Sequence, residues 1–589
     1  MKQFLITIAG VFLGLALFFI GVPLLLVAYV AASTAPAPVV GRNVLVLDLR
    51  EGISDQDPRD PFSLFTGKTL SVMGIEQTLR RAAADDHVGG LFVRLPEAGI
   101  APASADELRG AFLRFRAAKK PILAYSQGLY ASGMVTSTYE LAAASGDVWM
   151  QPSSQFQVTG MARDDIFFKR FFDKHDIKPD FQQRNQYKTA INGYLYSDYT
   201  LAHRESELSW MGSVYDTALG FAATDRKRPE IAIKTSLEAG PYSAEDALAK
   251  GLIDRVGTLH AAGLAIRKLA GDDATLMKFA DYEKSQTTDG SGSTVAVISL
   301  EGAIMTGSGG GAPNPFGGET TVRSDDITRA FRAAIDDDAV KAIVFRVSSP
   351  GGSDTASEQI LDAVREARAA GKPVVVSMGT YGASGGYWIS SQANEIVAQL
   401  STLTGSIGVF GGKFALGDAV AKFGVDMRGL KVGGDYADAN GSVSPMTASQ
   451  RAASSAEMDR IYGAFIQRVS EGRHLAPARV REIANGRVWT GAQAKGLGLI
   501  DSLGGFYDAV ERAKSLAGIK DGAHLVTFGV DQSPFEAIRH MVGASISGVR
   551  AVSGAAAIAH TPLGATLSTR LNEARLRSGG ADVLASAPW

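Results

Sequence analysis

The sequence predicts an α/β protein made of two tandem copies of one structural unit, preceded by a membrane-spanning helix. Three observations support this fold class: matched segments recur at a constant separation, strand-like runs alternate with helical patterns, and a long uncharged run opens the chain. At 589 residues the chain also exceeds the size that one hydrophobic core usually serves, so more than one domain is expected.

The repeat is visible in three pairs of segments, all at the same separation of 252 residues and without a gap. The pairs are Gly90–Leu95 with Ala342–Val347, Lys120-Pro121 with Lys372-Pro373, and Ala131–Gly133 with Ala383–Gly385. Each copy also opens with a β-rich run and closes with a similar run that ends in Leu-Ile-Asp. We therefore expect repeats at residues 43–284 and 294–527, joined by a linker rich in Ser, Gly and Thr at 285–293.

The second copy shows how strands and helices alternate within the unit. Ile327–Ile335 and Ala356–Ala370 carry apolar residues at helical spacing, and Ala342–Val347 and Val374–Ser377 are short strand-like runs. This alternation is typical of βαβ units and of a parallel sheet. The chain then ends in a tail, residues 528–589, that is rich in Ala, Gly and Ser.

The N-terminal run predicts a membrane anchor. Residues 4–30 contain no charged side chain, and after Lys2 the next charge is Arg42. At about 1.5 Å per residue, this run can cross the ~30 Å hydrocarbon core of a bilayer. A cleaved signal peptide is the alternative, but its apolar region is usually only about 7–15 residues long. We expect a retained single-pass anchor at residues 1–33, with the N-terminus in the cytoplasm and the bulk of the chain outside.

Composition excludes several classes of function. Basic and acidic residues nearly cancel, 59 against 61, so nothing indicates a nucleic-acid partner. The chain has no cysteine, which excludes disulfides, thiolate catalysis and cysteine-ligated metals. No metal-binding motif is present, and the glycine-rich stretch Gly307–Gly311 is not followed by the Gly-Lys-Ser/Thr of a phosphate-binding loop. We expect neither a metal nor a cofactor.

The segment Gly379–Trp388 carries the strongest indication of chemistry. It follows the expected strand Val374–Ser377, and Ser384 stands among glycines just before a helix-compatible run. Glycines let another backbone approach closely, and a helix N-terminus favours developing negative charge. These features suit a nucleophilic serine that attacks an acyl carbon. A glycine-rich turn capped by serine is the competing interpretation.

A second glycine-rich turn carries Gly351 and Gly352 between a strand and a helix. Backbone amides at such a turn are good donors to an oxyanion, although a steric need for glycine would explain the pair equally well. The first copy reads Pro96–Ile100 at the matched position and has lost the paired glycines. We therefore interpret Ser132, which matches Ser384, as a structural remnant.

The general base is not obvious from the sequence. The chain has eight histidines, and none lies in a glycine-rich or strand-end context. Lysine is the other established base for serine nucleophiles, provided that desolvation lowers its pKa by about 3 units. Lys188, flanked by uncharged residues in Arg184–Ala190, is a candidate, and a solvated surface lysine is the alternative. The second copy has Tyr436-Ala437 near the matching position and offers no lysine there.

Three motifs together resemble the signal peptide peptidase A (protease IV) family, in its long bacterial form with two tandem domains. Tyr381–Trp388 is similar to the family's nucleophile motif and Ser401–Gly408 to its second signature. Gln186–Ala190 resembles its lysine motif, with Thr189 where serine is common. The resemblance runs over nearly the whole chain, from the N-terminal run to the tail.

The resemblance implies a Ser/Lys dyad divided between the two copies, with Ser384 as nucleophile and Lys188 as general base. Ser406 would orient the lysine. The oxyanion hole would be formed by backbone amides of Gly351 or Gly352 and of Gly385. The resemblance also implies a fold similar to the Clp protease and crotonase superfamily, and homo-oligomers, expected to be tetramers, on the periplasmic side of the bacterial inner membrane.

We therefore predict a membrane-anchored serine endopeptidase that degrades cleaved signal peptides and other short apolar peptides through an acyl-enzyme. A crotonase-like acyl-CoA enzyme is one alternative, but it would be soluble and would rely on carboxylates rather than a serine. A non-catalytic membrane scaffold is the other, in which the glycines only shape turns. The anchor and Ser384 argue against the acyl-CoA enzyme.

Overall fold

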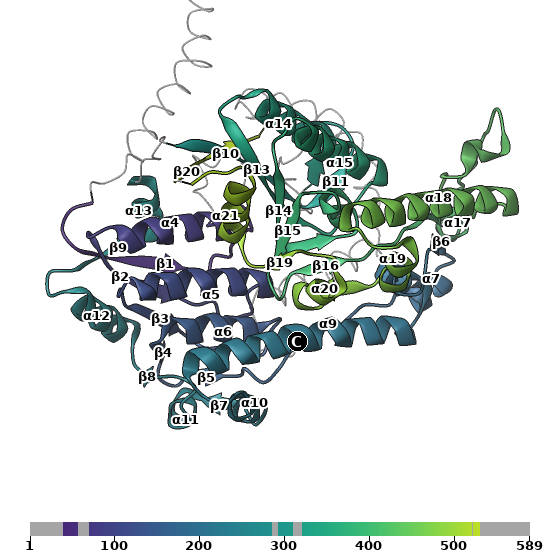
Figure 1. Ribbon diagram of the computed structural model, residues 1–589. Coiled ribbons are helices and arrows are strands. Elements are labelled where there is room, and N and C mark those ends of the chain that lie inside the picture. The colour runs from purple at the N-terminus through teal and green to yellow at the C-terminus, as the bar shows by residue number, and fades with distance from the viewer. Residues whose placement is uncertain (1–38, 57–69, 286–291, 310–320, 521, 530–589) are drawn as a thin grey trace, which may run out of the picture.

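The computed structural model describes residues 39–56, 70–285, 292–309, 321–520 and 522–529 (Figure 1). The expected anchor at residues 1–33 lies outside these ranges, as do residues 286–291 of the expected linker and 530–589 of the expected tail. Among the helices of the described ranges, none combines the length and the apolar character needed to cross a bilayer.

The first half of the chain forms a six-stranded parallel sheet in the order β8-β4-β3-β2-β1-β9. Its strands are β1 (Asn43–Asp48), β2 (Val88–Arg94), β3 (Ile122–Ser126), β4 (Val148–Met150), β8 (Arg255–Val256) and β9 (Thr275–Lys278). The central strand β2 is buried along nearly its whole length, because helices cover both faces of the sheet.

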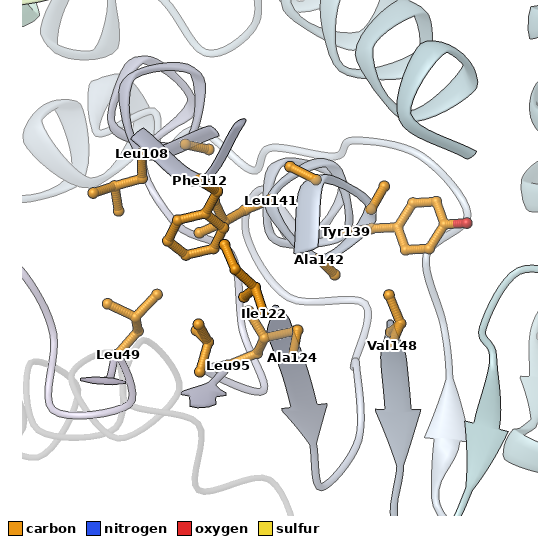
Figure 2. Close-up of a cluster of buried hydrophobic side chains, with 14 of the residues drawn as sticks. Leu49, Leu95, Leu108, Phe112, Ile122, Ala124, Tyr139, Leu141, Ala142 and Val148 are labelled. Atoms are coloured by element: carbon orange, nitrogen blue, oxygen red, sulfur yellow. The ribbon is translucent and has the colours of Figure 1, made fainter. Parts of the chain in front are cut away.

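Three helices cover one face of this sheet: α4 (Val72–Ala84), α5 (Pro102–Ala117) and α6 (Val135–Ser145). Figure 2 shows Phe112 of α5 and Leu141 of α6 in the core above Ile122 of β3. Helix α12 (Leu259–Ala270) packs its apolar side on the opposite face. The remaining elements of this half are β5 (Gln155–Phe156), α7 (Lys169–Lys174), β6 (Lys178–Gln183), the 3-10 helix η2 (Thr189–Ile191), α8 (Asn192–Leu195), α9 (Leu201–Arg226), α10 (Glu230–Glu238), β7 (Tyr242–Ser243), α11 (Ala244–Ala249) and α13 (Phe279–Ser285).

The second half forms an eight-stranded sheet whose main path is β18-β16-β14-β13-β10-β20, with β15 beside β14 and β19 beside β15. Its strands are β10 (Ser293–Glu301), β13 (Val340–Ser349), β14 (Val374–Ala383), β15 (Glu395–Ala398), β16 (Leu403–Gly405), β18 (Val488–Thr490), β19 (Ser502–Leu503) and β20 (Ala523–Phe528). All pairings are parallel except β16 with β18. The predicted α/β class and its strand–helix alternation are confirmed.

Helices again cover both faces of the second sheet. On one face lie α14 (Ser324–Asp336), α15 (Asp354–Ala369) and α16 (Gly385–Ser390), and α21 (Phe506–Leu516) packs on the other. The remaining elements of this half are β11 (Ala303–Met305), β12 (Thr321–Arg323), β17 (Phe410–Ala415), α17 (Gly417–Ala421), the 3-10 helix η3 (Asp435–Asp438), α18 (Ala448–Arg473), α19 (Pro477–Ile483) and α20 (Gly491–Leu497).

The two halves repeat each other, but the separation between matched residues changes along the chain. Helices α4 and α14 begin at residues 72 and 324, which differ by 252, whereas α9 and α18 begin at 201 and 448, which differ by 247. Tyr139 and Tyr387 mark the change, because their hydroxyls donate to Leu252 and Leu499 respectively, and residues 139 and 387 differ by 248. The first half therefore has about one extra helical turn between Ser132 and Tyr139.

The two halves are joined by a small antiparallel sheet of β6 from the first half and β17 from the second. Helix α9, which packs against α6 (Figure 1), adds a second connection, since it also contacts β18. There the Ser213 and Thr490 hydroxyls lie 2.7 Å apart. Lys188 follows β6 in the chain and Ser406 precedes β17, so the β6–β17 pairing brings these two predicted site residues toward each other.

Candidate active site

Ser384 lies on a sharp turn between strand β14 and helix α16. Its backbone adopts φ of +54° and ψ of −119°, a conformation that residues other than glycine rarely adopt. The Ser384 N–H donates to the Gly405 carbonyl of the neighbouring strand β16 at 2.9 Å, which holds the turn in place. The turn presents the partly buried hydroxyl at the carboxyl end of the parallel strands, where α/β proteins place their ligands.

Lys188 comes from the other half of the chain and points into the same site. It precedes η2, and its side chain is only 4% exposed. The Nζ atom lies 3.0 Å from the Ser384 Oγ, 2.9 Å from the Ser406 Oγ and 2.8 Å from the Ser406 carbonyl oxygen. Burial lowers the pKa of Lys188 to about 7.

These three contacts match what a neutral amine can make. An unprotonated lysine has two N–H donors and one lone pair. The two donors can bind the carbonyl and the hydroxyl of Ser406, which leaves the lone pair to accept the Ser384 hydroxyl proton. The geometry can therefore support proton transfer from the serine to the lysine.

The glycine turn after β13 lies against the serine. A side chain on Gly351, whose φ is +108°, would meet the Gly385 nitrogen at 2.6 Å and the Ser384 Cβ at 2.7 Å. The Gly351 N–H donates to the Ser349 Oγ at 3.1 Å. Within the described ranges, the backbone N–H groups of Gly352 and Gly385 have no hydrogen-bond acceptor. The two turns are close, because a Cβ built on Gly385 would lie 3.1 Å from the Gly352 nitrogen.

The turn at residues 484–487, which no sequence motif marked as part of the site, packs between the loop that carries Lys188 and the segment that carries Ser406. The Tyr187 N–H donates to the Asn485 carbonyl, and the Ser406 N–H donates to the Arg487 carbonyl at 2.7 Å. Gly486 lies so close to the lysine loop that a Cβ on it would be 2.5 Å from the backbone nitrogen of Lys188. The Ala-Asn-Gly-Arg turn was visible in the sequence, but only as a turn signal without a partner.

Ser132 has a different setting from Ser384. It is partly exposed, and its carbonyl accepts from the Gly99 N–H at 3.3 Å. Counting back from the matched tyrosines sets Thr136 opposite Ser384, but Thr136 lies inside helix α6, whereas Ser384 precedes helix α16. No lysine contacts the Ser132 hydroxyl within the described part of the chain.

A pocket of about 280 Å³ lies beside Lys188 and Ser406. Its wall includes Arg163, Asp165 and His203. Burial lowers the pKa of His203, and its Nδ1 has no hydrogen-bond partner in the described residues. No hydrogen bond joins His203 to the serine there. The described residues also include no group of three or more His, Asp or Glu side chains that could hold a metal ion.

The model of a known peptidase family matches two segments of the chain, residues 114–272 and 366–520, one in each half and together more than half of the sequence. The chain belongs to peptidase family S49. Among similar proteins, Protease 4 of Salmonella typhi is 34% identical over 473 residues, which cover 76% of this chain and 72% of the relative. Serine protease SPPA of Arabidopsis thaliana is 27% identical over 533 residues, covering 86% and 74%. This S49 chain is a serine peptidase, and the predicted resemblance to the protease IV family is confirmed.

A solved structure of ClpP1 from Listeria monocytogenes also matches, with 12% identity and a TM-score of 0.22, over 36% of this chain and 94% of the other. A score this low does not support an argument about this S49 chain.

Proposed function

We propose that Ser384 is the nucleophile of this serine peptidase and that Lys188 is its general base. The observation that carries the proposal is the 3.0 Å distance between the Lys188 Nζ and the Ser384 Oγ. Burial lowers the pKa of this amine to about 7. At neutral pH a large fraction of such an amine is unprotonated, so it can accept the serine proton.

In the acylation step, the Ser384 Oγ attacks the carbonyl carbon of the scissile peptide bond while its proton passes to the Lys188 Nζ. The negative charge that develops on the carbonyl oxygen is stabilised by the N–H groups of Gly352 and Gly385. One such donor is typically worth about 3 kcal/mol in the barrier. Gly351 supports this oxyanion hole by allowing the two turns to approach each other.

Lys188 then returns the proton to the leaving amine while the peptide bond breaks and Ser384 stays acylated. In deacylation, a water molecule attacks the ester while Lys188 takes a proton from it. Lys188 then gives this proton to the Ser384 oxygen as the ester bond breaks. The carbonyl and hydroxyl oxygens of Ser406 hold the Lys188 Nζ both when it is neutral and when it carries the proton. It is therefore the orienting residue of the proposed dyad.

The proposed substrates are cleaved signal peptides and other short apolar peptides. Two observations support this class. The uncharged run at residues 4–30 would hold the enzyme at the bilayer, where such peptides accumulate. The motifs around Ser384, Ser406 and Lys188 also resemble those of the signal peptide peptidase A family.

We propose a single-pass anchor at residues 1–33 in the bacterial inner membrane. The catalytic part, repeats 43–284 and 294–527 with a Clp protease/crotonase-like fold, would then lie in the periplasm. We also propose a homo-oligomer, a tetramer by family resemblance. The length of the uncharged run and the positive charge of Lys2 support the anchor and its orientation.

The decisive experiment compares the purified wild type with Ser384→Ala, Lys188→Ala and Ser132→Ala on a fluorogenic apolar peptide. The first two substitutions should abolish cleavage, because they remove the nucleophile and the base, whereas Ser132→Ala should keep most of it. Circular dichroism checks that all four proteins are folded. Strong cleavage by Lys188→Ala would contradict the dyad.

Labelling with a serine-reactive fluorophosphonate separates the peptidase from the scaffold alternative. We expect a label on the wild type that Ser384→Ala loses. Membership of a peptidase family already favours a peptidase over a crotonase-like acyl-CoA enzyme.

A further inference from the structure

Two buried carboxyl groups meet where helices α5 and α6 face the second half of the molecule. Asp106 on α5 is 5% exposed and Glu140 on α6 is fully buried. In the described part of the chain, neither carboxylate oxygen of Glu140 receives a hydrogen bond from a donor group. An ionised carboxylate in this setting would be strongly unfavourable, so Glu140 must be neutral or find a partner.

The second half shows what the same pair of positions does there. Residue 358 on α15 matches residue 106, and residue 388 on α16 matches residue 140. The Trp388 Nε1–H donates to the Glu358 carboxylate at 2.7 Å. In the first half a glutamate replaces the tryptophan, and Glu140 can donate to Asp106 only if it carries a proton.

The electrostatic surroundings favour one proton for the pair. Burial raises the pKa of Asp106 to about 6. Burial, and then the neighbouring charge of Asp106, raise the pKa of Glu140 well above its usual range. The other charged groups around Glu140 are Arg109 of α5 and Asp225 of α9, which form an ion pair at 2.6 Å and largely offset each other. Near neutral pH, Asp106 is therefore ionised and Glu140 is protonated.

The ionised Asp106 holds a segment of the other half. Its oxygens accept hydrogen bonds from the Ser401 N–H at 2.9 Å and from the Ser401 hydroxyl at 3.2 Å. Ser401 is the first residue of the strap, Ser401–Ser406, that runs beside the nucleophile strand. Further along it, Gly405 accepts from the Ser384 N–H, and Ser406 contacts the Lys188 Nζ.

We propose that Glu140 and Asp106 are positioning residues that share one proton and hold the strap in the register that keeps Ser406 and Gly405 against Lys188 and Ser384. The effect on catalysis rests on the proposed dyad. The shared proton itself can be tested without catalysis.

The first experiment measures folding in a Ser384→Ala background, with and without Glu140→Gln. A group whose pKa is raised in the folded state binds more protons folded than unfolded, so its contribution to stability falls as pH rises above the unfolded pKa of about 4.3. Between pH 5 and 7, we expect the ratio of the unfolding equilibrium constants of the Glu140 protein and the Glu140→Gln protein to rise about tenfold for each pH unit. Urea titrations measure this difference.

Glu238→Gln, an exposed glutamate on α10, is the matched control and should leave the pH dependence unchanged. Identical pH dependence with Glu and Gln at position 140 would overturn the shared proton. This result is independent of whether Ser384 and Lys188 form the dyad.

The second experiment measures cleavage in the wild-type background. Glu140→Gln should cleave near neutral pH, because its amide N–H can donate to Asp106, whereas Glu140→Leu, which cannot, should lose at least tenfold in kcat. The wild type should lose activity in alkaline solution as the pair loses its proton, and Glu140→Gln should not. The same alkaline decline in both, or full activity of a folded Glu140→Leu, would overturn the positioning role. If no variant, wild type included, cleaves the peptide, the proposed function fails and the folding experiment still decides the shared proton.

Discussion

Lys188, the proposed general base, shows how burial alone lowers the pKa of a lysine. Its side chain is 4% exposed, and the three atoms around its Nζ are oxygens of hydroxyl and carbonyl groups. A neighbouring carboxylate would have favoured the ammonium and raised the pKa. Hydroxyl and carbonyl oxygens satisfy the amine without opposing its deprotonation to the same degree, so desolvation is the effect that prevails.

We expect kcat/KM to rise with pH through about 7 and then to level off, before any alkaline decline caused by Glu140. The neutral amine is the active form, so activity below pH 7 should fall about tenfold for each pH unit. Initial rates on an apolar peptide without ionisable side chains measure this profile. Lys188→Arg, which stays charged, should show no rise, and a wild-type profile that is flat from pH 5 to 8 would exclude Lys188 as the base.

The site residues differ in how far the sequence could identify them. Ser384 stands in a glycine-rich turn between a strand and a helix, and these local features predicted its position. The burial of Lys188 depends on residues about 200 to 300 positions further along, which no local pattern reveals. The family resemblance suggested the pairing, and the structure brings the two side chains together. Their catalytic roles stay predictions.

At the scale of elements, the turn between α19 and β18 holds the loop that carries Lys188, the proposed base. Its Asn485 carbonyl accepts from the Tyr187 N–H, and its Gly486 N–H donates to the carbonyl of Ile407, the residue after the strap. The turn therefore contacts both the loop that carries Lys188 and the chain next to Ser406. Gly486 has φ of +78°. Only glycine combines this conformation with so close an approach to another backbone.

Gly486→Ala should lower kcat/KM at least tenfold. The new Cβ would lie 2.5 Å from the backbone nitrogen of Lys188 and 2.6 Å from the Lys188 Cβ. Lys188 must therefore shift, which disturbs the contact between its Nζ and Ser384. Steady-state rates and urea unfolding measure the effect. Gly496→Ala in α20 is the matched control, because nothing lies within 4 Å of its Cβ position. The control should stabilise the protein by about 0.5–1 kcal/mol without loss of activity. Equal activity of the two variants would contradict this role of Gly486.

The repeat was the part of the fold that the sequence predicted best, and its failure is local. A separation of 252 residues correctly pairs α4 with α14 and α5 with α15. It no longer holds after Ser132, where the first half has an extra helical turn before Tyr139. The short Ala-Ser-Gly match hid this insertion, because small residues suit both the end of a turn and the start of a helix.

At the scale of the whole molecule, the proposed mechanism requires that the two halves keep a fixed relative position. Arg346 of β13 is fully buried between them. It donates to Asp55 and Glu107 of the first half, at 2.5 and 2.8 Å, and to Ser377 of β14 at 2.9 Å. One guanidinium thus links strands β13 and β14, which lead to the glycine turn and to Ser384, with the half that carries Lys188.

Arg346→Ala should destabilise the protein by about 3–5 kcal/mol, because it leaves Asp55 and Glu107 buried without their counter-charge. The first half provides a matched control in Arg94, at the equivalent position of β2. The Arg94 side chain is 18% exposed, lies 3.5 Å from Asp48 and donates to Gln127, and these partners stay within reach of water, so Arg94→Ala should cost only about 1 kcal/mol. Guanidinium unfolding measures both. Cleavage by Arg346→Ala should also be lost at lower denaturant concentration than far-ultraviolet circular dichroism, because the halves separate before each sheet unfolds. Equal costs for the two arginines would mean that the ionic contact does not hold the halves together, and the β6–β17 pairing would then be the connection that aligns Lys188 with Ser384.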